Sequence, residues 1–277
     1  MSEPAISPHE ATVRKADYDR YLAAMVAPKA AQQHLFALYA FNCEVAKIGG
    51  SVREPIAGHI RLQWWREAID EAYAGRTRAH PVVASLTELV AVFRPPQELF
   101  EQLIDARESD LEETPFADMA SLEAYANATS GNVMRLAARI LGGNDSLDDA
   151  AKGAGVAYAL TGLLRSLPYH ASRRHLMLPL DILRELEIDP EEIFAGNASE
   201  RLPRVIKQIA DHARESFASA QRPIPRRLVP ALLPAALVPI YLRVLVRPGF
   251  DPFRESSDVP SYRRQLAMAG AFFRKSL

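Results

Sequence analysis

Residues 155–179, GVAYALTGLLRSLPYHASRRHLMLP, decide the expected fold of this 277-residue chain. Their apolar side chains recur at helical spacing. The helix that they predict, residues 146–167, stops at Pro168, because a proline ring does not fit a helix interior. Almost every long segment on either side shows the same spacing, and no segment alternates convincingly at period two. The sequence therefore predicts an all-α protein.

Proline and glycine set the boundaries of the other predicted helices. These helices are 17–27, 29–48 after Pro28, 60–74 before Gly75, one that opens at His80-Pro81, 98–111 after Pro95-Pro96, 121–141 before Gly142-Gly143, short helices after Pro179, 200–220 and 262–275. The loops between them are mostly short, and no internal repeat is visible. We therefore expect one helical domain over residues 1–277.

Composition excludes several classes of protein. With 48% hydrophobic and 24% charged residues, the chain can bury a core that disordered and collagen-like sequences cannot form. The single cysteine, Cys43, cannot form an internal disulfide, and residues 1–20 lack the apolar stretch of a signal peptide. We therefore expect a cytoplasmic protein. The net charge of −1 gives no indication of a nucleic-acid partner, and we expect none.

Charge is distributed unevenly along the chain. Residues 1–100 carry 11 basic and 11 acidic side chains, residues 101–200 carry 8 and 18, and residues 201–277 carry 14 and 5. The three parts therefore have net charges of 0, −10 and +9. Two interpretations stay open: the acidic middle and the basic end neutralise each other within the fold, or the basic end binds diphosphates, anionic lipid or an acidic protein.

Residues 228–246, LVPALLPAALVPIYLRVLV, form the most apolar window, and by length alone they approach a membrane span. Pro230, Pro234 and Pro239 each remove a helical hydrogen bond that lipid cannot replace. We therefore expect a kinked helix buried in the bundle. The alternative is a helix that lies on a membrane surface, which would place the protein at the periphery of the inner membrane.

Three segments together show a family resemblance. They are ALYAFNCEVAKIGG at 37–50, residues 105–141 with DARESDL and LEAYANATSGNV, and the opening stretch at 155–179. In order and spacing they resemble the squalene and phytoene synthase family of head-to-head prenyl transferases. The resemblance implies an isoprenoid synthase bundle of helices around a central, largely apolar cavity.

The resemblance fails at the residues that carry the family's chemistry. Members hold Mg²⁺ and a diphosphate between two pairs of aspartates, because Mg²⁺ prefers hard oxygen ligands. Aligned on the flanking residues, the first pair falls on Ala46 and Gly50, and the second on Ser166 and His170. Lys47 adds a positive charge beside the first pair. We therefore expect no catalytic residue, no metal site and no cofactor, with Mg²⁺ needed only if the chain is an active enzyme.

Other residues of these segments survive as candidate contacts of the cavity or of a ligand. They are Tyr39, Asn42, Glu44, Tyr125, Asn132, Arg165, Tyr169 and Arg173. Because Pro168 disfavours helical geometry at Leu167, Ser166 and His170 need not share a helix face. The second degenerate pair is thus expected to differ in backbone geometry as well as in side chains.

A divergent branch of the family resembles this chain more specifically. RLQWWREAID at 61–70, AHPV at 79–82 and LRSLPYHASRR at 164–174 are similar to the mitochondrial complex I assembly factors with a squalene/phytoene synthase-like domain. That resemblance implies a noncatalytic assembly role, a protein partner and a cavity open to an isoprenoid or another lipid.

The alternative is a Mg²⁺-dependent head-to-head prenyl transferase of the squalene or phytoene synthase type. It would need carboxylates supplied from elsewhere, for which Asp105, Glu108, Glu112 and Glu113 are candidates. A charged helix end explains the same residues without a metal.

Overall fold

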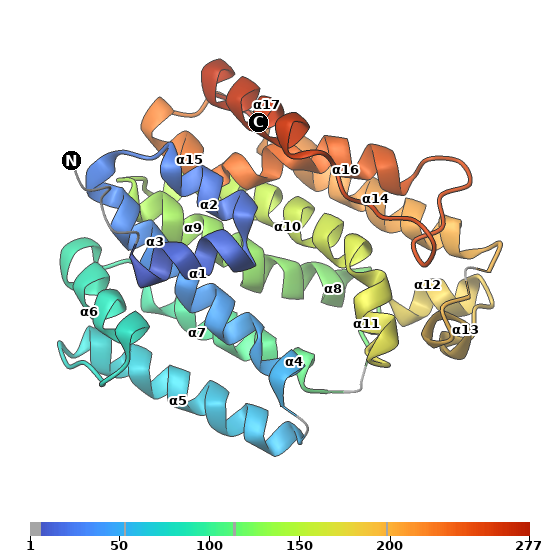
Figure 1. Cartoon of the computed structure of the whole chain (residues 1–277), viewed down its shortest axis with the longest axis horizontal. Coiled ribbons are helices and arrows are strands. Elements are labelled where there is room, and N and C mark those ends of the chain that lie inside the picture. Colours follow the sequence, from blue (N-terminus) through green and yellow to red (C-terminus); the bar gives the residue numbers. More distant parts are fainter. Residues whose placement is uncertain (1–6, 53, 113–114, 198) are drawn as a thin grey trace.

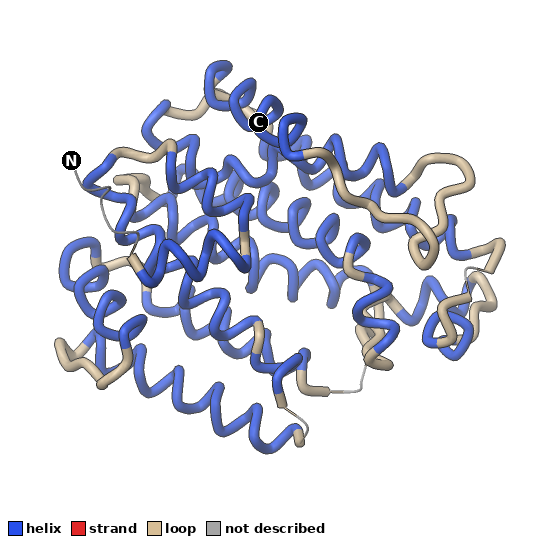
Figure 2. Tube along the Cα trace, viewed as in Figure 1, coloured by secondary structure: helices blue, strands red, loops and turns tan. Residues whose placement is uncertain are grey.

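The computed structural model describes residues 7–52, 54–112, 115–197 and 199–277, and every regular element within these ranges is helical (Figure 2). The predicted all-α isoprenoid synthase bundle is confirmed. Glu113, a candidate carboxylate of the enzyme alternative, lies outside the described residues.

The helices follow one another closely along the chain (Figure 1). The α-helices are α1 (Pro8–Ala16), α2 (Tyr18–Met25), α3 (Lys29–Ala46), α4 (Ile48–Ser51), α5 (Pro55–Tyr73), α6 (Pro81–Phe93), α7 (Gln97–Ala106), α8 (Met119–Ala126), α9 (Asn132–Ile140), α10 (Asp148–Arg165), α11 (Leu167–Ser172), α12 (Leu180–Glu185), α13 (Pro190–Phe194), α14 (Leu202–Ala220), α15 (Val229–Leu232), α16 (Val238–Leu245) and α17 (Ser261–Arg274). Short turns join some of them: η1 (Arg107–Asp110), η2 (Asn127–Gly131), η3 (Asp145–Leu147), η4 (Arg226–Leu228) and η5 (Leu233–Leu237).

Helix α10 occupies the middle of the bundle, where it packs against α14, α9, α8 and α16. Small residues on α10 allow this close packing. A Cβ atom added at Gly155 would lie 2.5 Å from the backbone nitrogen of Gly131 in η2, and one added at Gly153 would lie 2.6 Å from the carbonyl oxygen of Ser216 in α14. Residues 150–157 therefore fix α10 between two neighbours through backbone contact, not through large side chains.

The predicted helix 121–141 is divided in the structure. Helices α8 and α9 are joined by η2, a single π-helical turn. Thr129 Oγ1 donates a hydrogen bond to the carbonyl oxygen of Tyr125 within this stretch (2.7 Å), and Gly131 at its end meets Gly155 of α10. The π turn widens the helix at its contact with α10, and hydrophobic spacing alone does not reveal such a turn.

The first helix was not predicted. Ser7 Oγ accepts a hydrogen bond from the backbone N–H of Glu10 (3.1 Å), and Pro8 occupies the first turn of α1. Val13 is the buried residue of this helix, which packs on α3. The Ser-Pro start with an acidic residue in the first turn is a local helix signal, and the helix it begins is too short to show a long apolar pattern.

The apolar window 228–246 forms α15, η5 and α16, and its prolines lie in the first turns of these elements. Residues Arg226–Leu245 are long and apolar enough to cross a membrane by length and composition, yet 72% of that window is buried in the bundle. The structure therefore agrees with the predicted buried and kinked segment, because each proline sits where its missing N–H has no helical partner to lose.

Candidate functional site

A cavity of about 820 Å³ lies where the C-terminal end of α3 meets α4, η1, α11 and α13. Ala46 and Gly50 line it from one side, and His170 lines it from α11. Three of the four degenerate motif positions are thus brought together around one space. The fourth, Ser166, does not line the cavity.

Ser166 is turned away because the helix is interrupted there. Helix α10 ends at Arg165, and Ser166 has φ −92° and ψ 8° before α11 starts at Leu167. The Ser166 hydroxyl donates to the carbonyl oxygen of Gly162 (2.8 Å). Pro168 was expected to disfavour helical geometry at Leu167, but Leu167 is helical and the interruption lies one residue earlier, at Ser166.

Side chains from α11 cover the position of Gly50. Arg173 Nη1 donates a hydrogen bond to the carbonyl oxygen of Gly50 (2.9 Å), and the Arg173 guanidinium lies 4.7 Å from the centre of the Tyr169 ring. A Cβ atom added at Gly50 would approach the Tyr169 hydroxyl to 2.9 Å. A phenol and a guanidinium therefore occupy the space beside a position where the family resemblance places a metal-binding carboxylate.

The lining of the cavity is basic. Its cationic side chains are Lys47, Arg107, Arg173 and Arg174, and its carboxylates are Asp110 and Glu112. Among the described residues that line the space, lysine and arginine outnumber aspartate and glutamate by four to two. The potential in the cavity therefore favours an anion over a divalent cation.

The carboxylate of Asp110 is engaged within the protein. The Tyr125 hydroxyl donates to Asp110 Oδ1 (2.7 Å), and Arg107 Nη1 donates both to Asp110 Oδ2 (3.1 Å) and to the Tyr125 hydroxyl (2.8 Å). Burial raises the pKa of Tyr125, with the nearby Asp110 charge as a further cause, so the phenol keeps its proton. Asp110 and Arg107 were missed at the sequence level, although both lie in DARESDL.

Of the carboxylates considered as replacements, Glu112 lines the cavity, whereas Asp105 and Glu108 face elsewhere. Arg66 Nη2 of α5 lies 2.7 Å from Asp105 Oδ1 and 2.5 Å from Glu108 Oε1, outside the cavity lining. In the part of the chain that the structure describes, no group of three or more His, Cys, Asp or Glu residues is placed to hold a metal ion. The charged helix end accounts for Asp105 and Glu108.

His170 is uncharged at neutral pH. Burial, followed by repulsion from His175, lowers the pKa of His170 to about 4, and the two imidazole rings lie 5.6 Å apart. His175 Nε2 lies 3.3 Å from the carbonyl oxygen of Ser109, which links the loop after α11 to η1. His170 therefore adds no charge to the cavity at pH 7.

Of the eight candidate contacts, Tyr125, Tyr169 and Arg173 line the cavity. Glu44 is paired with Lys47 (2.5 Å) beside it. Asn132 is fully buried between α9 and α7, where its amide donates to Gln102 Oε1 (3.1 Å). Arg165 points to the opposite side of the end of α10, and its guanidinium carbon lies 3.7 Å from the centre of the Tyr241 ring.

Tyr39 and Asn42 are buried in α3 away from the cavity lining. Beside Tyr39 runs a buried polar cluster that the sequence did not reveal. Arg20 Nη1 lies 2.6 Å from Asp17 Oδ2, Arg20 Nη2 donates to Ser130 Oγ (2.9 Å), and the guanidinium lies 5.1 Å from the centre of the Tyr158 ring. This cluster ties α2 to η2 and α10.

The cavity was expected to be largely apolar, and that expectation is wrong for the space at the degenerate motif. Most of its lining side chains are polar or charged. The interior beyond it is filled by large buried groups such as Tyr39, Phe41 and Tyr241, together with the Arg20 cluster.

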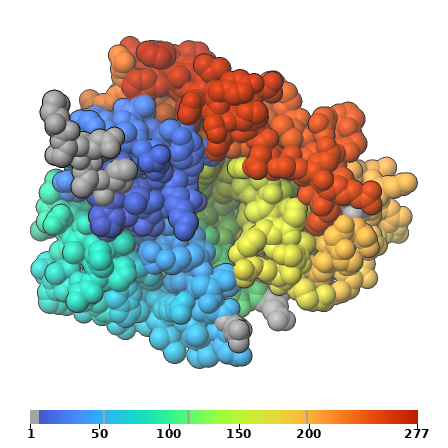
Figure 3. Space-filling model, in the orientation of Figure 1, coloured from blue at the N-terminus to red at the C-terminus, as the bar shows by residue number. Residues whose placement is uncertain are grey.

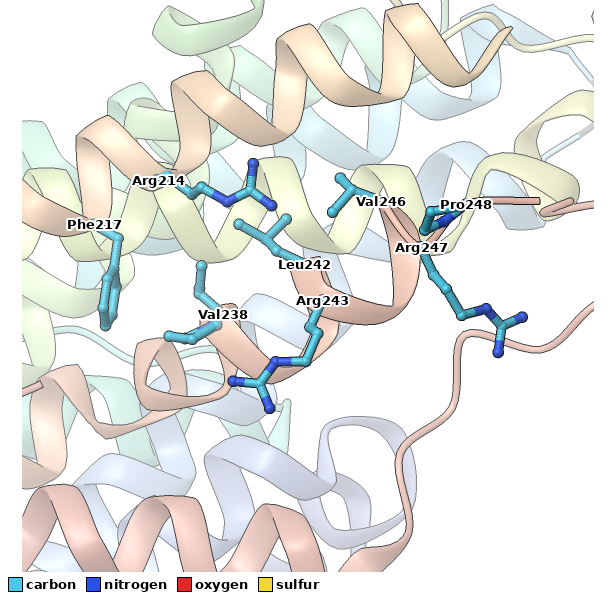
Figure 4. A pocket seen from close by; sticks show the side chains of 9 residues that line it. Arg214, Phe217, Val238, Leu242, Arg243, Val246, Arg247 and Pro248 are labelled. Atoms are coloured by element: carbon cyan, nitrogen blue, oxygen red, sulfur yellow. The ribbon is translucent and has the colours of Figure 1, made fainter. Parts of the chain in front are cut away.

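A second hollow, a groove of about 560 Å³, lies between α14 and α16 (Figure 4). Phe217, Val238 and Leu242 are among its apolar lining. Three guanidinium groups, those of Arg214, Arg243 and Arg247, stand around it. Arg214 is paired with Asp211, and Arg247 with Glu255, whereas Arg243 is exposed and has no ion pair within the described residues.

Comparison with known proteins gives concordant matches. The family model described as squalene/phytoene synthase matches residues 13–267. The mouse protein named NADH dehydrogenase (ubiquinone) complex I, assembly factor 6 is 32% identical over 248 residues, which cover 88% of this chain and 74% of the mouse protein. Presqualene diphosphate synthase of Rhodopseudomonas palustris is 30% identical over 241 residues, covering 83% of this chain and 84% of that enzyme. A dehydrosqualene synthase crystal structure superposes with a TM-score of 0.83 at 17% identity, over 96% of this chain and 94% of the other.

Proposed function

Because this chain belongs to the squalene/phytoene synthase family, we propose that it is a noncatalytic member that assists the assembly of respiratory complex I. The observation that carries this proposal is the basic cavity at Ala46, Gly50 and His170. A prenyl transferase of the expected type needs several carboxylate oxygens there, and in this cavity four lysine and arginine side chains outnumber the carboxylates of Asp110 and Glu112.

The charges that line the cavity disfavour the binding of Mg²⁺, on which the family's prenyl transfer depends. A diphosphate leaves a prenyl chain readily when Mg²⁺ neutralises its charge, and the metal needs oxygen ligands held in place. Asp110 is already hydrogen-bonded to Tyr125 and paired with Arg107, so a metal would compete with both groups for its oxygens. Lys47 and Arg173 would also repel the ion. The cavity is therefore suited to a role other than Mg²⁺-assisted ionisation.

A protein partner would find its site in the groove between α14 and α16. The groove combines apolar side chains with the free guanidinium of Arg243, and this pattern complements an acidic segment with an apolar face. The mouse relative is named as a complex I assembly factor, which supports a partner in that process. We assign the groove to a complex I subunit or assembly intermediate.

Deletion of the gene in its native host tests this assignment. We expect less assembled complex I on native gels, restored by the wild-type chain. Arg243→Glu is expected to restore assembly poorly, because it places a carboxylate against an acidic partner. Arg184→Glu on α12, also at an exposed arginine, is the matched control and is expected to restore assembly fully. Normal assembly in the deletion strain would overturn the proposal.

The second candidate function is a prenyl transferase, favoured by the identity to presqualene diphosphate synthase and by the presence of Asp110 and Glu112 in the cavity. Incubation of the purified chain with Mg²⁺ and farnesyl or geranylgeranyl diphosphate separates the candidates. Pyrophosphate release that Asp110→Asn abolishes would establish the enzyme.

We also propose that the cavity binds an isoprenoid or another lipid. The Nε atom of Arg107 is buried and has no hydrogen-bond partner among the described residues, so it can donate to an acidic head group. We further propose a cytoplasmic protein at the periphery of the inner membrane. Lipid extraction from the purified protein, followed by mass spectrometry, tests the first statement, and cell fractionation tests the second.

A further inference from the structure

Helix α17 carries a stripe of exposed apolar side chains. Tyr262, Leu266 and Phe273 are 58%, 68% and 74% exposed, and their spacing of four and then seven residues places them on one helix face. Met268 and Ala271 on the opposite side are buried against the bundle. The stripe therefore faces outward along the whole helix.

The orientation of α17 is fixed by the rest of the protein. Arg264 Nη1 lies 3.0 Å from Asp19 Oδ1 of α2, and the backbone N–H of Ile224 donates to the carbonyl oxygen of Lys275 (3.0 Å). Helix α17 lies at the edge of the bundle, where the C-terminal residues form part of the upper rim of the space-filling view (Figures 1 and 3). The helix cannot turn to bury its stripe without losing these contacts.

Basic residues surround the stripe, and acidic residues are absent from the two segments that form this region. Residues 216–250 and 259–277 together contain nine arginines and lysines and no aspartate or glutamate. Arg226 lies 5.0 Å from the centre of the Phe272 ring, and Arg263 lies 5.9 Å from the centre of the Tyr262 ring. The margins of the apolar stripe therefore carry positive charge.

The acidic middle of the chain does not neutralise this charge. Among the described residues, Arg201 with Glu187 is the one ion pair that joins a lysine or arginine of 201–277 to a carboxylate of 101–200. Of the two interpretations of the charge distribution, internal neutralisation thus accounts for little of the excess. Most of the basic end stays available to an external anion.

A hollow of about 490 Å³ adjoins the C-terminal end of α17. Arg222, Arg274 and Lys275 are its cationic lining residues. Three cations around one hollow suit a phosphate group, which offers several acceptor oxygens and a negative charge. The hollow lies at the end of the helix that carries the apolar stripe.

We propose that α17 is a membrane-docking helix, with Tyr262, Leu266 and Phe273 inserted among the lipids of an anionic bilayer and Arg222, Arg274 and Lys275 on lipid phosphates. This surface deepens the peripheral location proposed above and does not depend on complex I assembly. A bilayer fits the observations because a fluid surface accepts side chains that project from a convex helix. The cations of residues 216–250 and 259–277, two segments that contain no aspartate or glutamate, complement anionic head groups.

Sedimentation of the full-length protein with vesicles tests the proposal. The vesicles contain phosphatidylcholine alone or phosphatidylcholine with phosphatidylglycerol. We expect binding to the anionic vesicles that weakens as salt is raised, because screening shortens the reach of the basic residues. The double variant Leu266→Glu/Phe273→Glu is expected to bind about tenfold more weakly or worse, because it loses two inserted apolar groups and adds two repelled charges.

A matched double variant and a charge variant sharpen the result. Ile56→Glu/Ile60→Glu changes two residues of α5 that are 66% and 65% exposed, and it is expected to bind as the parent does. Arg274→Gln/Lys275→Gln is expected to weaken binding and reduce its dependence on salt. Circular dichroism and urea unfolding confirm that each variant is folded.

Three results would overturn the assignment: no binding to anionic vesicles at low salt, equal binding by the α17 and α5 variants, or a dimer that the α17 variant dissociates while vesicles leave the protein in solution. The last result would assign the stripe to a second copy of the chain. Because none of these measurements involves complex I, failure of the docking helix is distinguishable from failure of the assembly role.

Discussion

Helix α10 is tightly packed through its middle and open near its C-terminal end. Comparing these two regions shows which residues maintain the fold and which line the candidate site. Gly155 in the middle leaves no room for a Cβ atom beside Gly131, whereas a Cβ at Gly162 would meet no atom within 4 Å. Helix α3 is divided in the same way, with Phe41 fully buried and Ala46 at the cavity. The helix middles hold the bundle together, and the helix ends line the site.

This division would allow a chain to keep the family fold while the residues of its site change. A substitution in the helix middles must satisfy close packing on several sides, so few side chains fit. At the helix ends an aspartate can be exchanged for alanine or glycine without loss of core contacts. The structural match to a dehydrosqualene synthase therefore shows the shared scaffold and leaves the activity to the residues at the ends.

The largest expected difference between the two regions concerns buried charge. Arg20→Met is expected to lower the free energy of unfolding by about 3–5 kcal/mol, because it strands Asp17 in the interior without its partner. Arg173→Met at the exposed cavity edge is expected to cost less than about 1 kcal/mol. Urea denaturation of both variants measures the difference. Equal losses of unfolding free energy in the two variants would contradict the distinction between the tightly packed interior and the open cavity edge.

The two glycines of α10 give a second test. Gly155→Ala is expected to destabilise the protein by about 2–3 kcal/mol, because the new methyl group meets backbone that cannot move aside. Gly162→Ala is expected to stabilise it by about 0.5–1 kcal/mol, because alanine favours the helix and the space is open. We expect the midpoint of thermal unfolding to fall for Gly155→Ala and to rise for Gly162→Ala. A Gly155→Ala variant as stable as the parent protein would contradict the comparison.

A smaller effect is expected at the cavity when pH changes. His170 has a pKa of about 4 in the folded protein and about 6.5 when exposed, so between these values the unfolded chain binds more protons. Stability is therefore highest above pH 6.5 and falls as pH drops toward 4. With allowance for partial solvent access, the fall is about 2 kcal/mol. His170→Gln should flatten this part of the profile in urea unfolding at several pH values, and an unchanged slope would show that His170 is not buried as described.

Most of the fold could be predicted because helical spacing and proline or glycine boundaries are local features. Helix α3 starts at Lys29 and α17 covers Ser261–Arg274, within one or two residues of the expected limits. The π turn at η2 could not be predicted, because it depends on the contact between Gly131 and Gly155 across the bundle.

The candidate site was predicted in part for a similar reason. Alignment brought Ala46, Gly50 and His170 to one place, since helices of a shared fold keep their relative positions. The engagement of Asp110 by Tyr125 and Arg107 depends on tertiary pairing between η1 and α8, which no local pattern encodes. The polar lining of the cavity could not be predicted either, because side chains of several elements contribute to it.

Pyrophosphate release from farnesyl diphosphate in the presence of Mg²⁺ tests the central claim most directly. With the cavity lined by Lys47, Arg107 and Arg173, and Asp110 already paired, we expect release no faster than with heat-inactivated protein. Steady turnover that stops when Mg²⁺ is chelated would contradict this account and would show that the helix ends still carry the family's chemistry.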